Sequence, residues 1–318
     1  MIQMKEEQNN ISRVLGQKVD YPTTYDKSIL VREARQTNRS HVGLVDEDLP
    51  FVGFDTWNAY EFTCLQDNGI PVAGILKIVY DCDSKYIVES KSLKLYLNSF
   101  NFYKCGDSQV QCFTNAEEII SKDLSELLET DVSCYISHCG IPTCAIISEI
   151  FTPNTGEPNI NNVNWKLLNC HTTDVAYPND EYVEDPNLLK VVENKSCFGV
   201  QAYWCNTLFS RCKVTKQPDH GDIYIYYQGD KKIDERSLLL YITSIRNECH
   251  FHEEICETVY KRLYDLLDSP TDLAVGCFYV RRGGIDINPM RASNKTLLNY
   301  LFNEVKRADI PHIKSMKQ

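Results

Sequence analysis

One cysteine, Cys212, lies in a stretch whose neighbours could make it a nucleophile. Three cationic side chains occupy residues 211–216, and positive charge favours the thiolate form that attacks electrophiles. Asp219 follows Pro218 and is close to Gly221; both are turn formers, so the chain can fold back and bring the carboxyl group towards the thiol. The pattern predicts a nucleophile with an acid beside it. A loop with an incidental cysteine would show the same spacing.

A second candidate group lies at the expected start of a helix, where His252 and Glu253 are adjacent. A carboxylate accepts two hydrogen bonds side by side, which suits the adjacent N–H donors of a guanine-like ring, and a histidine can move protons near neutral pH. The structural alternative is a helix-terminal charge next to a capping residue. Cys249, His250 and Cys256 add possible zinc ligands, but no CxxC or HExxH spacing supports a metal site, and none is expected.

Two further stretches could bind phosphate. Residues 281–284 read Arg-Arg-Gly-Gly, which offers two cations and a backbone that can approach an anion closely. Residues 89–101 begin with an acid and carry two lysines among apolar residues, a pattern that could grip a planar ligand and a phosphate. A solvated hairpin tip and an ordinary amphipathic segment are the plainer alternatives. No GxGxxG motif follows a strand, so a Rossmann domain is not indicated.

Composition sets the class of protein. The 318 residues allow one large domain or two of ordinary size, and 43% hydrophobic with 24% charged residues is typical of soluble globular proteins. A net charge of −11 argues against nonspecific binding to nucleic acid or anionic membranes. The polar residues 1–10 do not resemble a signal peptide, so the 14 cysteines are expected to be reduced thiols. We therefore expect a cytoplasmic protein without direct nucleic-acid or membrane binding.

The first half of the chain alternates between strand and helix patterns. Residues 57–63 and 72–80 have the alternation of strands and are separated by a turn at residues 67–69. Residues 116–130 place their apolar side chains on one face of a helix, and Asn115 is a suitable N-cap. A further strand is predicted at residues 132–136.

The second half repeats this arrangement. Residues 234–245 align with residues 89–100 without a gap, with identical residues at Ser92/Ser237, Leu93/Leu238, Leu95/Leu240, Tyr96/Tyr241 and Ser99/Ser244. Each copy follows a predicted strand and precedes a predicted helix and another strand. The match indicates a tandem duplication, and it predicts an α+β protein with two antiparallel sheets, each backed by helices.

The duplication divides the chain into four parts. We expect an N-terminal arm at residues 1–50, a first module at 51–150, a connection at 151–190 and a second, catalytic module at 191–318. Only the second module carries Cys212, and only the first carries the two-lysine stretch. A site that draws on both would lie where the modules meet, which is a common place for pockets.

Four of these motifs together resemble the NADPH-dependent 7-cyano-7-deazaguanine reductases, the nitrile reductases of queuosine biosynthesis. The resemblance runs from about residue 15 to residue 291, and it rests on residues 89–101, Cys212 with residues 217–219, residues 251–253 and residues 281–289. The two-module length resembles the long form of the family. Its members have two tunnelling-fold (T-fold) domains and form homodimers.

The resemblance implies a mechanism. Cys212 would add to the nitrile carbon and form a covalent thioimide, Asp219 would protonate the nitrogen, and His252 would be the third catalytic residue. Two hydride transfers from NADPH would then give 7-aminomethyl-7-deazaguanine. Asp219 would need surroundings that keep a carboxylic acid protonated near neutral pH. The implied substrate contacts are Val88, Glu89, Ser90, His252 and Glu253, and the implied NADPH contacts are Ser90, Lys91, Arg282 and Gly283.

The sequence also departs from the family. The stretches at 103–113 and 177–191 are longer than usual. Ile255 occupies a position where some relatives have a cysteine, and Cys256, the nearest cysteine, lies about 100° further round a helix, so a disulfide with Cys212 is not expected. Two other functions remain: a zinc-dependent pterin or purine cyclohydrolase of the same fold, and a base-binding or scaffold protein without catalysis.

Overall fold

The computed structural model describes residues 22–138, 163–171, 173, 175–178, 181–192 and 199–307. The start of the expected arm (residues 1–21) and much of the expected connection lie outside the described residues. In the first half the elements are η1 (Lys27–Ile29), β1 (Arg32–Ala34), α2 (Gln36–Val42), β2 (Val52–Gln66), β3 (Pro71–Asp81), β4 (Tyr86–Val88), α3 (Ser90–Asn98), η2 (Ser99–Phe102), β5 (Lys104–Gly106), α4 (Gln109–Leu128) and β6 (Val132–His138).

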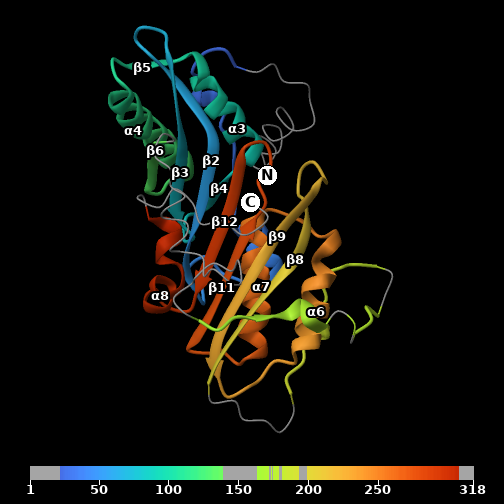
Figure 1. Cartoon of the computed structure of the whole chain (residues 1–318). Coiled ribbons are helices and arrows are strands. Elements are labelled where there is room, and N and C mark those ends of the chain that lie inside the picture. The colour runs from blue at the N-terminus through green and yellow to red at the C-terminus, as the bar shows by residue number, and fades with distance from the viewer. Residues whose placement is uncertain are drawn as a thin grey trace.

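The second half has a similar order of elements (Figure 1). They are β7 (Lys166–Leu167), η3 (Leu168–His171), η4 (Pro186–Leu188), β8 (Gly199–Cys212), β9 (Pro218–Gly229), α6 (Glu235–Ser244), η5 (Ile245–Asn247), β10 (Cys249–His250), α7 (His252–Leu266), β11 (Asp272–Tyr279), β12 (Ile285–Ala292) and α8 (Lys295–Lys306). Within the described residues, no helix is both long enough and apolar enough to cross a membrane.

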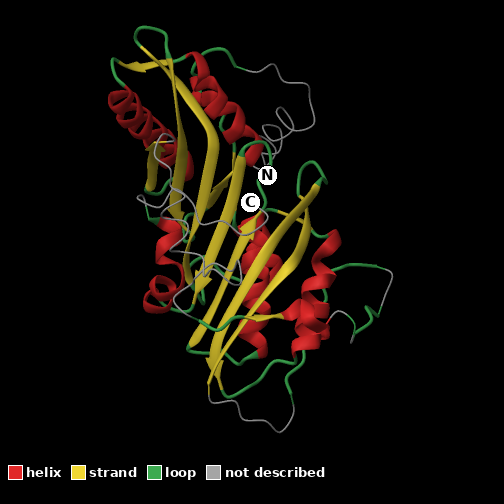
Figure 2. Ribbon diagram, in the orientation of Figure 1, coloured by secondary structure: helices red, strands yellow, loops and turns green. Residues whose placement is uncertain are grey.

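The two halves share one sheet, and the prediction of two separate sheets is wrong. The main strand order is β10-β8-β9-β11-β12-β2-β3-β6 in a ten-stranded sheet, with β5 beside β2 and β7 beside β8. The halves join because β12 pairs antiparallel with β2 over eight residues, from Ile285 opposite Ala59 to Ala292 opposite Val52. Figure 2 shows the strands of both halves side by side in this continuous sheet. The long strands are antiparallel, and the α+β class is confirmed.

The same contacts recur in both halves. The backbone N–H of Val31 donates to Ser92 Oγ at 3.0 Å, and that of Lys190 donates to Ser237 Oγ at 3.0 Å. Each serine lies in the first turn of the matching helix, α3 or α6. The expected arm and the expected connection therefore supply equivalent segments to their halves. The domain boundaries and the T-fold modules stay predictions.

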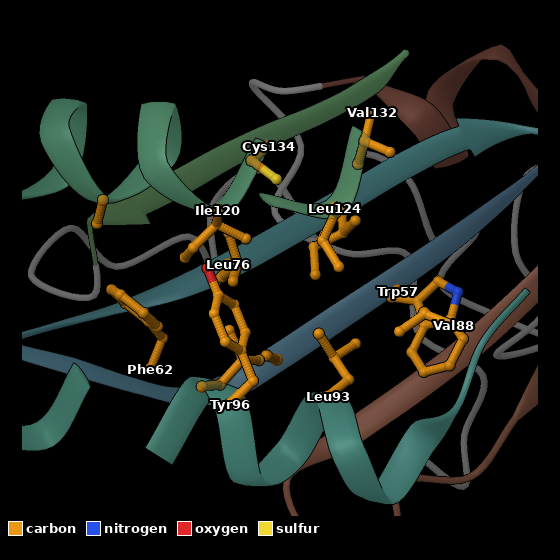
Figure 3. Packing of buried hydrophobic residues seen from close by; sticks show 14 of the residues in the cluster. Trp57, Phe62, Leu76, Val88, Leu93, Tyr96, Ile120, Leu124, Val132 and Cys134 are labelled. Carbon is orange, nitrogen blue, oxygen red and sulfur yellow. The ribbon is translucent and has the colours of Figure 1, made fainter. Parts of the chain in front are cut away.

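The core lies on both faces of the sheet. Helices α3 and α4 cover one face of β2 and β3, and Figure 3 shows Leu93 and Tyr96 of α3 and Leu124 of α4 packed around these strands. Helices α6 and α7 cover β8, β9 and β11 in the same way. In β9, Ile223 belongs to that cluster, whereas the next residue, Tyr224, packs in the cluster that contains α8. Because neighbouring side chains point to opposite faces of a strand, α8 covers the other face.

Helix α4 begins seven residues earlier than predicted. Its N-cap is Ser108, whose Oγ accepts the N–H of Gln111, and not Asn115, whose side chain instead donates to Cys105 O at 2.6 Å. The reason is that Cys112 and Phe113 are buried and extend the apolar face of the helix towards its N-terminus. The long stretch at 103–113 therefore forms β5 and the first turn of α4 rather than an added loop.

A buried cluster of five charged side chains ties the N-terminal segment to both halves. Arg35 Nη2 lies 2.5 Å from Asp55, and Arg39 and Arg291 donate to Glu257 at 2.7 and 2.8 Å. Arg291 also donates to Asp55 at 2.8 Å. All five are at most 2% exposed. Burial raises the pKa of Glu257, but the three guanidinium groups lower it more, to about 2.

We expect the Glu257→Gln variant to lose roughly 3–5 kcal/mol of unfolding free energy, because it leaves buried guanidinium charge uncompensated. The stability that Glu257 contributes is present above about pH 4.5 and is lost as the pH falls towards 2. Urea unfolding at neutral pH measures the loss. The control is Glu126→Gln, which removes an exposed ion pair with Lys27 and should change nothing measurable. Equal effects of the two substitutions would contradict the prediction.

Candidate active site

The hairpin of β8 and β9 places the predicted nucleophile and acid. Cys212 ends β8, and its backbone N–H donates to Gln217 O at 2.9 Å across the turn. Asp219 is the second residue of β9 and is paired with Ser210. Cys212 and Asp219 both line one pocket. The prediction that the chain folds back between them is confirmed.

Comparison of the two halves shows that only the second hairpin, β8–β9, has a cysteine at this position. Both hairpins have a register shift, between Ala59 and Phe62 in the first and between Cys205 and Leu208 in the second. Counting from these shifts, Gln66 ends β2 where Cys212 ends β8. The first half therefore has the scaffold without the thiol.

Two neighbouring pockets lie where the halves meet. The first takes side chains from α3, the β8–β9 hairpin, α7 and β12, and the second lies between α3, β2 and the turn before β12. The empty space in them, open solvent included, is about 450 and about 790 Å³. The first contains Ser90, Cys212, Asp219, His252 and Arg282 of the predicted site residues, and the second contains Lys91 and Gly283.

Asp219 is held between two partners. Arg282 Nη1 donates to its Oδ1 in a short, charged hydrogen bond, and His252 Nε2 lies 3.4 Å from its Oδ2. Burial raises the pKa of Asp219, but His252 and Arg282 lower it more, so the pKa lies below its ordinary value. These surroundings favour the carboxylate, in contrast to the protonated acid that the implied mechanism needs.

His252 is fixed by an aromatic contact as well. Its ring stacks on Tyr279 with centroids 3.7 Å apart and planes 8° from parallel. Nε2 faces Asp219, while Nδ1 is buried and has no hydrogen-bond partner among the described residues. The stack aims the imidazole at the carboxylate, which suits a proton-transfer role.

The two predicted ring-binding glutamates and Val88 lie behind the pockets rather than on their walls. Glu89 is the N-cap of α3, and its oxygens accept the N–H groups of Lys91 at 2.9 Å and Ser92 at 2.7 Å. Glu253 follows His252 in α7 and is 1% exposed, yet its Oε1 has no partner within the described structure. A buried carboxylate oxygen without a partner is unusual and points to a ligand. Burial, with a smaller effect of Asp55, raises the pKa of Glu253 to about 8.

The cations that face the pocket are not all those expected from the sequence. Arg211 donates to Asn247, and Lys213 pairs with Glu254 at 2.8 Å, while Lys94 and His250 line the pocket with Cys212. His250 stands opposite Cys212 in the β10–β8 pairing. Burial lowers its pKa, but hydrogen bonds with two glutamates raise it more, to about 9, so it is cationic at neutral pH. The sequence indicates His250 only as a possible metal ligand, and not as a cation of the pocket.

Lys94 lines both pockets. Its ammonium group makes no hydrogen bond or ion pair among the described side chains, and burial followed by the charge of Arg282 lowers its pKa. A Cβ on Gly283 would lie 3.3 Å from Lys94 Nζ. Together with Lys91, this cation gives the second pocket two groups that suit a phosphate.

The turn before β12 shapes the second pocket. Arg282 N–H donates to Ile285 O at 2.9 Å, and Gly283 and Gly284 have φ of 56° and 77°, as a tight two-residue hairpin turn requires. Arg281 points elsewhere and lies 4.1 Å over the ring of Tyr60. Of the two arginines in this motif, only Arg282 faces the first pocket.

Two sequence families match the chain. The family described as "Nitrile reductase, 7-cyano-7-deazaguanine-reductase N-term" matches residues 21–136, and "QueF-like protein" matches residues 218–297. Similar curated proteins are named NADPH-dependent 7-cyano-7-deazaguanine reductase. The one from Rickettsia massiliae is 36% identical over 89% of this chain and 93% of its own length. The one from Colwellia psychrerythraea is 34% identical over 88% of this chain and 91% of its own length.

Proposed function

This chain belongs to the NADPH-dependent 7-cyano-7-deazaguanine reductases, and we propose that its Cys212 pocket reduces the nitrile of 7-cyano-7-deazaguanine to an aminomethyl group. It is an oxidoreductase, and its cofactor is NADPH. The observation that carries the proposed site is the presence of a thiol, a carboxyl group and an imidazole, from Cys212, Asp219 and His252, in one pocket between the halves. A scaffold protein without catalysis does not need that combination.

The first step is addition of the thiol to the nitrile. The sulfur of Cys212 forms a bond to the nitrile carbon while one C–N π pair moves to nitrogen, which takes a proton from Asp219. The thiol proton leaves to His252 or to water, so the product is a neutral thioimide. Such a carbon accepts hydride more readily than a nitrile carbon does. His252, stacked on Tyr279, keeps the acid in place.

The second pocket is the proposed cofactor site, and its lining includes one carboxylate, that of Glu61, beside the two lysines. Gly283 and Gly284 bring the backbone close, Lys91 and Lys94 offer positive charge, and Ser90 and Arg282 lie at the border with the first pocket. When bound, NADPH supplies hydride, and two equivalents are needed to take a nitrile to an amine. The chain would hold the phosphates through Lys91, Arg282 and the backbone at Gly283.

The substrate ring would be read by the buried glutamates. Glu253 has an unpartnered oxygen directly after His252 in α7, and Glu89 lies at the head of α3 on the other side of the junction. Val88, Ser90 and His252 would complete the contacts. A carboxylate that accepts two N–H groups would select a guanine-like edge.

Three broader features belong to this proposal. The chain would work as a homodimer of subunits with two T-fold modules, the arm and connection ending near residues 50 and 190. It would act in the cytoplasm on a free deazaguanine base for tRNA queuosine, without binding nucleic acid or membranes itself. The family and the α+β sheet support these features.

The test is a stoichiometric assay. We expect two NADPH to be oxidised for each molecule of 7-aminomethyl-7-deazaguanine formed, because nitrile to amine is a four-electron reduction. NADPH absorbance and product quantification by mass spectrometry measure the ratio. A ratio above two would mean that the imine is released before the second reduction, and no oxidation with reduced, folded protein would reject the reductase. A requirement for stoichiometric zinc would favour the cyclohydrolase.

A further inference from the structure

The side chain of Arg282, a proposed cofactor contact, makes three hydrogen bonds to the β8–β9 hairpin that carries Asp219. Its Nη1 donates to Asp219, while its Nη2 donates to Gln217 Oε1 at 2.5 Å and lies 3.5 Å from Thr215 Oγ1. These partners all belong to the turn and strand that follow Cys212. The guanidinium group is therefore bound to the hairpin that carries Cys212.

The backbone of Arg282 is anchored, whereas its side chain is partly exposed. Its N–H and C=O both bond Ile285 across the glycine turn, which anchors the main chain. The side chain is 30% exposed, and the next residue, Gly283, lines the second pocket with Lys91. An anion bound in that pocket would lie within reach of the guanidinium and would compete with Asp219 for it.

We propose that Arg282 is a positioning residue that holds Asp219 as a carboxylate until a phosphate of the cofactor draws its guanidinium into the second pocket. This inference rests on the proposed function, because it concerns the acid and the cofactor pocket of that reaction. It makes nitrile addition depend on cofactor binding. Asp219 can then take up the proton that it must donate once the hydride donor, NADPH, is bound.

The surroundings of Asp219 support this coupling. His252 and Arg282 are its direct charged partners, with Lys94 of α3 at longer range, Cys212 at the end of β8, and the buried Tyr279 of β11. The pKa of Asp219 lies below its ordinary value because His252 and, after it, Arg282 together outweigh burial. Removing Arg282 leaves burial opposed mainly by His252, so the carboxyl group takes up a proton more readily.

The predicted consequence is specific to the first chemical step. Thioimide formation consumes one proton from Asp219 at the nitrile nitrogen and uses no hydride. A carboxylate bound to Arg282 cannot supply that proton. The step should therefore be slow without cofactor and faster when any ligand with the same phosphates occupies the second pocket, including NADP⁺, which carries no hydride.

The experiment measures thioimide formation without NADPH, by stopped-flow absorbance and intact-protein mass spectrometry. In the wild type, saturating NADP⁺ should speed adduct formation about tenfold at neutral pH, the size of effect that one neighbouring charge gives a carboxyl group. Arg282→Gln should form the adduct about tenfold faster than the wild type without NADP⁺, and its pH profile should extend to higher pH. NADP⁺ should add nothing further in this variant.

The matched control is Arg281→Gln, which removes the neighbouring cation that lies over Tyr60 and does not touch Asp219. It should behave as the wild type does. A role of Arg282 in cofactor binding alone predicts unchanged adduct formation in Arg282→Gln without NADP⁺, and that result would overturn the proposal, as would slower formation. If Arg282→Gln fails to fold, a wild type that does not respond to NADP⁺ overturns it equally. If the wild type forms no adduct under any condition, the proposed function itself fails.

Discussion

Cys212→Ala is expected to abolish nitrile reduction, with kcat lower by roughly 10⁴-fold or more, the range seen when a covalent nucleophile is removed. The reason is that, in the part of the chain that the structure describes, no other thiol lines the first pocket. Cys256, the cysteine of α7, is fully buried and its Sγ lies 3.6 Å from Val275 O and Pro289 O. The variant should still bind the substrate, because the ring contacts proposed for Glu89 and Glu253 do not involve the thiol.

The measurement combines steady-state NADPH oxidation with intact-protein mass spectrometry after incubation with the nitrile. The wild type should gain the mass of the substrate and Cys212→Ala should not. Cys249→Ser is the control, since Cys249 lies in the adjacent strand β10, is partly exposed and does not line the pocket. An adduct that persists in Cys212→Ala, or is lost in Cys249→Ser, would assign the nucleophile elsewhere.

The fold could be predicted where its signals are local. Helix α6 repeats α3 because an acidic N-cap, a serine and an apolar face recur at the same spacing, and these features act within one or two turns. The single sheet could not be predicted in this way. Its joint is the pairing of β12 with β2, between residues more than 220 positions apart, and nothing in either strand specifies the partner. The early start of α4 was missed because burial of Cys112 and Phe113 depends on that same distant packing.

In the active site, too, the local features could be predicted and the long-range contacts could not. The sequence indicated Cys212, Asp219, His252 and Arg282 as separate candidates, and the structure brings them into one pocket. It could not indicate the bond between Arg282 and Asp219, which are 63 positions apart. The charge state of Asp219 depends on that bond. Local charge near Cys212 was also misleading, because Lys213 bonds Glu254 instead, and the pocket receives its cations from α3 and β10.

The affinity of the ligand-free protein for 7-cyano-7-deazaguanine is expected to rise with pH up to about 8, by about tenfold per pH unit, because the ring needs Glu253 as a carboxylate. At pH 7 the buried carboxyl group is mostly protonated and offers one donor and one acceptor. Two adjacent N–H groups of the ring need two acceptors, so binding should release about one proton. Calorimetric titration at pH 7 in buffers of different ionisation enthalpy measures the release.

The direction of the pKa shift of Glu253 can be tested in the ligand-free protein. The pKa of Glu253 is raised from 4.5 to about 8, so its contribution favours the folded state below pH 4.5 and is lost as the pH rises through 8. Unfolding free energy should therefore fall over this interval in the free protein. Substrate should restore it at the upper end, because it binds the ionised form. Glu253→Gln should remove the slope in both experiments.

Glu253→Gln should also lower kcat/KM by roughly 10³- to 10⁵-fold, the range for a site whose hydrogen bonds to a ligand edge are mismatched. The amide places a donor against one N–H group of the ring, and burial keeps water from replacing the lost bond. Glu254→Gln is the matched control, since the oxygens of Glu254 already bind Lys213 and His250. It should keep the pH dependence of affinity even where it lowers stability. If Glu253→Gln binds the substrate as the wild type does at pH 7, with the same proton release, the ring is recognised elsewhere, and Glu253 serves only the helix terminus.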